Sequence, residues 1–236
     1  DFSLRAGNDV SVDKAEAQVP PQVILENSKL RVWHKLDRFW QVPKAFIRVG
    51  IVSPFVYSTP RTMTYNRIFQ RVLNDDLNSF VYDASLAGCS YRVSCVPTGF
   101  RISVSGYNEK LPFLFKVLTS RILSLMEEMK NGNEAVLERF HRAQEGLLRE
   151  TKNYRLDTPY EVANYNSRLL LEQSVWFLDN YVNEMEGETA KAHPLTMKEC
   201  AEVAEESLLG RQRTELLCMG NIGTEEALDV AKVLEE

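Results

Sequence analysis

The stretch from residue 91 to 105 restricts the possible folds more than any other part of the sequence. Apolar residues alternate with polar ones on both sides of a Pro-Thr-Gly turn, in the pattern YRVSCVPTGFRISVS. A period of two on both arms predicts an antiparallel hairpin with one buried face and one polar face. The chain is therefore expected to contain a sheet whose strands bury one side.

The same reasoning extends the prediction along the chain. Three more strands are expected, over residues 29–35, 45–52 and 214–219. Helical spacing of apolar residues predicts helices over 60–87, 112–129, 133–153, 158–172, 175–184, 196–209 and 224–234. Two of them start at a Thr-Pro pair, in which threonine accepts an unpaired amide and proline needs no donor. This order predicts an α+β fold, a mostly antiparallel sheet with helices packed on one face.

Length and charge limit the function classes. The 236 residues suggest one domain, with residues 1–22 as a linker or the tail of a preceding domain and 23–236 as the folded unit. The net charge is −5 with acidic and basic residues interspersed, which argues against nucleic-acid binding. No apolar run reaches the ~20 residues of a membrane span, so no membrane association is expected.

The cysteines and histidines show no metal or catalytic spacing. Four cysteines form no CxxC pair and are interpreted as reduced, buried thiols, which favours a cytoplasmic or organelle-matrix location. Neither HExxH nor HxxEH occurs, and His34 and His193 are far from His141 in sequence. His141, Glu145 and Glu138 share a predicted helix, but one helix cannot surround a metal, and a solvated face is expected. We expect no catalytic, metal or cofactor residue.

Several segments resemble one known family. They are FWQVPKAFIRVGIVSP (39–54), LNSFVYDASLAGCSY (77–91), SGYNEKLP (105–112) and YNSRLLLEQSVW (165–176), together with the residues 219–221 and 1–5. In order and spacing they are similar to the third domain of the insulin-degrading-enzyme (pitrilysin, insulysin, M16) family of zinc metallopeptidases. The resemblance implies the metallopeptidase domain fold that is also called LuxS/MPP-like.

The resemblance also implies a role. Family members have four such domains in two halves around a chamber that encloses peptides, and an HxxEH helix in the first domain binds zinc. Around Ile68–Arg71, the corresponding helix of this sequence has no histidine, so zinc is expected in the parent enzyme and not in this domain. The implied partners are the catalytic N-terminal half, the fourth domain and peptide substrates, with a homodimer left open. The implied location is cytoplasmic, with the mitochondrial matrix as the alternative.

Two alternative functions stay open at this stage. One is an enzyme that is complete in this chain, whose activity would be lost on mutating His141. The other is a non-peptidase scaffold of the same superfamily, like a core subunit of respiratory complexes or of processing peptidases. Apart from function, some elements look too apolar for one small domain, namely Phe46, Val52, Phe55 and the stretch 176–178. They are expected either to fill the core of this domain or to form an interface with other domains.

Overall fold

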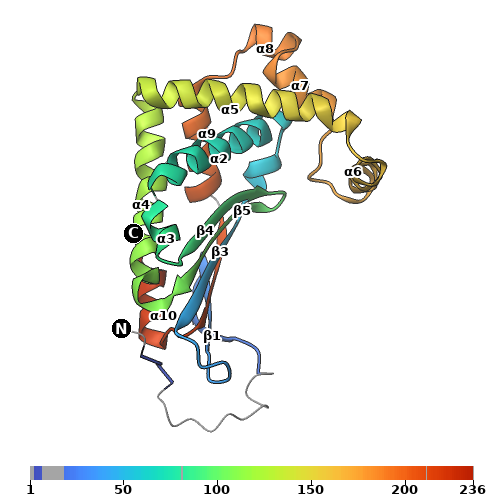
Figure 1. Ribbon diagram of the computed structural model, residues 1–236. Coiled ribbons are helices and arrows are strands. Elements are labelled where there is room, and N and C mark those ends of the chain that lie inside the picture. Colours follow the sequence, from blue (N-terminus) through green and yellow to red (C-terminus); the bar gives the residue numbers. More distant parts are fainter. Residues whose placement is uncertain (1–2, 7–18, 81, 211, 236) are drawn as a thin grey trace.

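The chain folds into one six-stranded sheet with its helices on one side (Figure 1). The computed structural model describes residues 3–6, 19–80, 82–210 and 212–235. The strand order across the sheet is β1-β2-β6-β3-β5-β4. The strands are β1 (Gln22–Glu26), β2 (Leu30–Leu36), β3 (Lys44–Val52), β4 (Ser90–Val96), β5 (Gly99–Tyr107) and β6 (Arg213–Gly220).

The sheet is antiparallel except at one pair, so the predicted fold class is confirmed. Strand β6 lies between β2 and β3, parallel to β2 and antiparallel to β3. It therefore occupies the centre of the sheet, although it is the last strand in the sequence. The predicted hairpin is β4 and β5, and its turn requires Gly99, whose φ is 143°. A Cβ at this position would lie 1.9 Å from the carbonyl oxygen of Ile51.

Most helices match the predicted ones, but the helix expected over 175–184 begins at Leu178, and the segment expected as one helix over 60–87 contains two. Thr59 Oγ1 accepts the Thr62 amide at 3.1 Å, and Thr158 caps the next Thr-Pro helix in the same way. The 3₁₀ segments are η1 (Pro54–Tyr57), η2 (Asn108–Lys110) and η3 (Tyr154–Leu156). The α-helices are α2 (Pro60–Phe80), α3 (Tyr82–Leu86), α4 (Leu111–Lys130), α5 (Glu134–Asn153), α6 (Pro159–Leu171), α7 (Leu178–Met185), α8 (Glu188–Ala192), α9 (Met197–Leu209) and α10 (Thr224–Lys232).

A single core lies between the sheet and the helices. Every second residue of β3 points into it, which leaves Ile47 and Val49 fully buried. Phe100 of β5 meets Phe69 of α2 edge-on, with ring centroids 6.5 Å apart. Helices α2, α4 and α9 contact β5 or its neighbour β4, and α10 contacts β2. Since all of these helices cover the same face, the other face of the sheet is left without a helical layer.

Apart from the 3₁₀ segments, one strand and one short helix were not predicted from the sequence. Strand β1 is a short edge strand with three consecutive apolar residues and a register shift between Val23 and Leu25, so it shows no alternation. Helix α8 has five residues and buries none of them, so it has no apolar period to detect.

The N-terminal segment contacts the domain close to α10, where the Arg5 amide donates to Asn221 Oδ1 at 2.6 Å. No described helix combines the length and apolar character that crossing a membrane requires.

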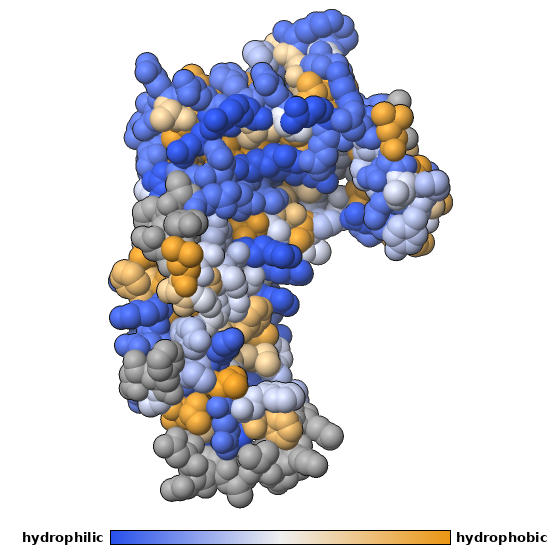
Figure 2. Space-filling view, in the orientation of Figure 1, coloured by the Kyte–Doolittle hydropathy of each residue, from blue (hydrophilic) through white to orange (hydrophobic). Residues whose placement is uncertain are grey.

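Helix α6 projects from the body of the domain and buries no residue (Figure 1). Apolar side chains in and beside it are strongly exposed. They are Leu156, Tyr160, Leu170, Leu171 and Phe177, with exposed fractions between 62% and 88%. Figure 2 shows orange, hydrophobic atoms among the polar ones on that projecting part of the surface. Of the residues expected to be unusually apolar, Val52 and Phe177 are exposed, whereas the others are half-buried, namely Phe46, Phe55, Trp176 and Leu178. The five strongly exposed residues, Leu156, Tyr160, Leu170, Leu171 and Phe177, are called the α6 patch below.

Candidate functional site: the uncovered face of the sheet

The face of the sheet turned away from the helices has no helical layer over it and is accessible. The cross-strand pairs place Phe46 between Ser105 on β5 and Met219 on β6, with all three on this face. In the next row, Leu217 of β6 pairs with Arg48 on one side and Trp33 on the other. Figure 2 shows the molecule hollowed between α6 and the lower end of the sheet. This surface is called the open face below.

A pocket of about 720 Å³ lies at the lower end of the open face. Its wall is formed by the loop between β2 and β3, in which the Asp37 carboxylate accepts the amides of Phe39 and Trp40, each at 3.0 Å. The Trp40 ring is 74% exposed. Apolar and charged side chains share the lining, which includes Phe39, Trp40, Phe46, Met219, Lys35, Lys44 and Asp37. The pocket could hold an apolar side chain beside an anionic group.

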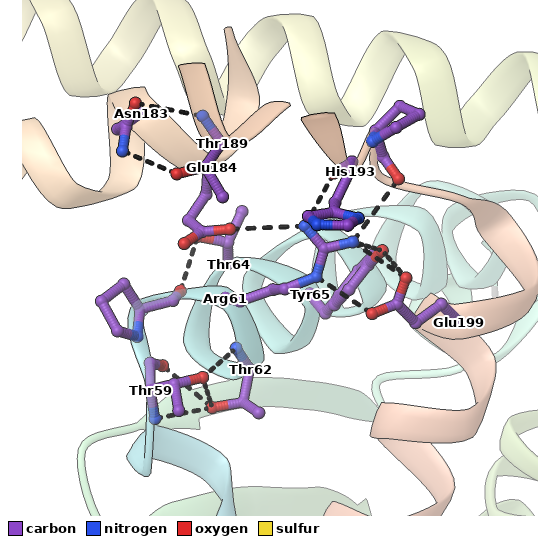
Figure 3. Close-up of polar contacts among 12 residues, drawn as sticks. Thr59, Arg61, Thr62, Thr64, Tyr65, Asn183, Glu184, Thr189, His193 and Glu199 are labelled. Atoms are coloured by element: carbon purple, nitrogen blue, oxygen red, sulfur yellow. Dashed lines mark hydrogen bonds and ion pairs between the residues drawn. The ribbon is translucent and has the colours of Figure 1, made fainter. Parts of the chain in front are cut away.

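A cluster of polar side chains lies among the helices, away from the open face, and joins them to one another (Figure 3). The Arg61 guanidinium on α2 donates to the carboxylate of Glu199 on α9 at 3.0 and 2.9 Å, and to the backbone oxygen of His193 at 2.9 Å. It also pairs with Glu184 on α7 at 3.4 Å. The Tyr65 hydroxyl donates to Glu199 at 2.7 Å. This cluster is called the Arg61 network below.

The electrostatics of the Arg61 network suit a structural role. Burial is the largest influence on the Tyr65 phenol and raises its pKa far above the ordinary value. The hydrogen bonds from Arg61 hold the pKa of Glu199 below its usual range, so this carboxylate stays ionised and paired. A general acid or base needs a pKa near the working pH, and neither group has one. The network holds α2, α7 and α9 together.

Helix α2 is the one that the family resemblance compares with the zinc-binding helix, and its residues do not fit a zinc ion. Here its charged side chains are carboxylates and arginines, and several of them pair with other helices. Asp76 accepts from Arg121 of α4 at 2.6 Å and from Arg139 of α5, and Arg71 pairs with Glu150 of α5. Zinc sites of this type need neutral imidazoles, and α2 contains none. These ion pairs join the helices and offer no open coordination position.

The remaining candidate ligands are dispersed. His141, Glu145 and Glu138 are all exposed on α5, as expected for a solvated helix face. His34 is buried on β2, where its Nε2 lies 2.8 Å from the Ile222 oxygen. Among the described residues, no group of three or more His, Cys, Asp or Glu could hold a metal ion. The four cysteines are free, and burial raises the pKa of the Cys95 and Cys218 thiols to about 12.

Known proteins match this sequence along almost its whole length. Residues 1–184 match the family described as the middle or third domain of peptidase M16. The insulin-degrading enzyme of Bos taurus is 29% identical over 227 residues, which are 96% of this chain and 21% of the relative. The peroxisomal insulin-degrading enzyme-like 1 of Arabidopsis thaliana is 29% identical over 231 residues, which are 97% of this chain and 22% of that protein.

The fold also matches a solved structure. A crystal structure of pitrilysin superimposes on 92% of this chain with a TM-score of 0.78 at 19% identity, and the match covers 21% of that chain. The fold is thus an α+β domain with its helices on one side of the sheet, as in the matched part of pitrilysin. The chain belongs to the M16 peptidase family, as its middle or third domain. It spans about a fifth of the length of the curated relatives that it matches.

Proposed function

We propose that this chain is the third domain of a longer zinc metallopeptidase, in which residues 23–236 form part of the wall of a chamber that encloses peptides. The observation that carries the proposal is the one-sided sheet in a domain of this family. Helices seal one face, and the open face offers a broad, slightly hollowed surface. A wall of this kind selects peptides by size and by surface charge rather than through one deep pocket.

In this proposal the catalytic chemistry belongs to another domain of the same polypeptide. No residue of this chain is assigned a catalytic, metal-binding or cofactor-binding role. Ion pairs within this domain support this assignment, because Arg121, Arg139 and Arg142 hold the carboxylates of α2, which are then not available to a metal. Zinc would be held by an HxxEH helix of the first domain, where it would supply the activated water for peptide hydrolysis.

The proposed partners are the catalytic N-terminal half and the fourth domain of the same polypeptide, together with the enclosed peptides. The α6 patch supports a contact with further domains, because isolated domains seldom expose so many large apolar side chains together. The proposed location is the cytoplasm, with the mitochondrial matrix as the alternative. Free cysteines support either compartment, since both keep thiols reduced.

Peptide hydrolysis by the full-length polypeptide tests the proposal. It should cleave peptides and lose that activity with a zinc chelator, whereas the 236-residue chain alone should neither cleave peptides nor retain zinc after dialysis. Elemental analysis of the dialysed chain measures the metal. One tightly bound zinc per chain would contradict the assignment. A full-length sequence without HxxEH, together with no peptidase activity, would favour the scaffold function instead.

A further inference from the structure

Three adjacent strands of the open face contain basic residues and no acidic residue. Strands β3, β5 and β4 carry Lys44, Arg48, Arg101 and Arg92, and not one aspartate or glutamate. All four side chains are exposed and lie on the open face. The chain as a whole has a net charge of −5, so this part of the sheet opposes the overall charge. These four residues are called the cationic face below.

The cross-strand pairs bring the arginines of the cationic face close together. Arg48 and Arg92 both pair with Ser103, one from each side. Their backbones therefore lie two strand spacings apart, about 10 Å. Arg101 is two residues before Ser103 on β5 and lies between the other two strands. Like charges at this spacing repel one another. An anionic ligand that reaches two or three of them at once gains from each and relieves that repulsion.

No carboxylate of the described residues neutralises these side chains. The Arg48 guanidinium lies over the Phe46 ring at 5.0 Å, and the Lys44 ammonium lies 5.8 Å from the Tyr107 ring centroid. Neither these two nor Arg92 and Arg101 form an ion pair within the described part of the chain. Cations that stack on rings remain free to receive an anion on their other side.

The opposite corner of the same sheet shows what a neutralised arrangement looks like. There Arg31 pairs with Glu26 and Glu215, and Arg213 pairs with the same two carboxylates. The Trp33 indole also donates to Glu215 at 2.7 Å. Both corners consist of solvent-facing strand residues, but only one contains its own counter-charges. The cationic face therefore differs from its surroundings in chemistry, not merely in exposure.

The groups around the arginines indicate the kind of anion. Ser103 lies between Arg48 and Arg92, and in the adjacent row of the sheet Ser90 and Ser105 are hydrogen-bonded at 2.7 Å. Apolar side chains border them, namely Phe46 and Met219, which lead into the pocket at the lower end. Carboxylate side chains spaced by small or apolar residues would match this mixture. A nucleic acid would present phosphates continuously and would be repelled by the acidic remainder of the chain.

We propose that the cationic face binds acidic segments of peptides, with an apolar residue of the peptide in the adjoining pocket. This inference extends the proposed function by naming the substrate class that the wall selects. It rests on the proposed function only in taking the bound peptides to be those that the chamber encloses. Binding by the chain alone is separate from hydrolysis by a larger polypeptide, so either proposal can fail while the other stands.

Fluorescence anisotropy with two labelled peptides tests the inference. The first peptide has glutamate at every second residue and one leucine, and the second has lysine in place of glutamate. We expect the 236-residue chain to bind only the acidic peptide, with an affinity that falls as salt is added. Changing Arg48, Arg92 and Arg101 together to glutamine should weaken binding about tenfold, because three exposed ion pairs with the peptide are lost.

A matched variant separates the cationic face from the general charge of the molecule. Lys116→Gln, Arg149→Gln and Lys198→Gln together remove the same charge from exposed positions on the helices. This variant should bind the acidic peptide within about twofold of the unchanged chain. Circular dichroism of both variants checks that the fold is retained. Equal weakening by both variants would overturn the proposal, and so would tighter binding of single-stranded RNA than of the acidic peptide.

Discussion

The Arg61 guanidinium on α2 and the Glu199 carboxylate on α9 face each other in a two-point contact, with hydrogen bonds of 3.0 and 2.9 Å. A two-point contact fixes the relative orientation of the two helices as well as their distance. The same arginine reaches the loop before α9 through the His193 oxygen. One side chain thus connects segments that are more than a hundred residues apart in the sequence.

Replacing Arg61 by alanine should destabilise the domain by about 2 kcal/mol, because Glu184 and Glu199 then lose their shared partner. The effect stays below that of a fully buried pair, since the Glu199 side chain is 40% exposed. Urea denaturation followed by circular dichroism measures the change. Lys198→Ala, at an exposed position of α9, is the control and should shift the midpoint little. Equal shifts in the two variants would refute a special role for Arg61.

Acid should weaken the domain through Asp76, which is 5% exposed. Burial raises the pKa of this carboxyl, but Arg121 and Arg139 outweigh it and hold the pKa below its usual value. A lowered folded-state pKa means that the stabilisation is complete above the unfolded-state pKa of about 3.9. It is lost as the pH falls through the lower pKa of the folded state.

The variant Asp76→Asn isolates this contribution. It should be less stable than the unchanged chain at neutral pH, and the difference should shrink as the pH falls through the acid range. Urea midpoints measured at a series of pH values provide the comparison. A difference that is constant with pH would show that Asp76 acts through packing and not through its charge.

Gly99 is required by the backbone of the hairpin turn. Its φ of 143° is unfavourable for any residue with a side chain, and an added Cβ would collide with the Ile51 carbonyl of β3. We expect Gly99→Ala to cost about 2 kcal/mol or more, as measured by thermal unfolding. Gly132→Ala is a useful comparison, because φ is also positive there but no atom lies within 4 Å of the added Cβ. It should cost clearly less.

The α6 patch should make the isolated chain self-associate at raised concentration. Changing Leu170 and Leu171 to glutamate should reduce this association without lowering the thermal stability, because both side chains are more than 80% exposed. Sedimentation velocity over a range of concentrations measures the effect. Leu86→Glu, at an exposed leucine of α3, should leave association unchanged. A strictly monomeric chain at high concentration would refute the prediction.

Local sequence patterns were sufficient to predict most strands and helices, but not the order of the strands in the sheet. The alternation in the β4–β5 hairpin and the Thr-Pro helix starts are short-range signals, and both were confirmed. The position of β6 between β2 and β3 depends on pairing across the whole chain, and no local pattern encodes it. The Arg61 network depends in the same way on residues brought together by the fold, so the sequence alone did not indicate it.

The cationic face could have been found from the sequence. Charges are interspersed over the whole chain, as expected, but three of the strands contain only basic ones. Counting charges strand by strand on the polar side of each alternation would have shown this. What the sequence could not supply was the register that places Arg48 and Arg92 on either side of Ser103.

The central position of the last strand has a consequence for synthesis of the protein. About 160 residues separate the end of β3 from the start of β6, so β2 and β3 leave the ribosome long before the strand that lies between them. At ~5–20 residues per second this interval is roughly 8–32 s. During that time both strands have an unpaired edge. The nascent chain therefore passes through a period in which chaperone binding would protect it most, and a chain that ends before Arg213 would keep the two parts of its sheet apart.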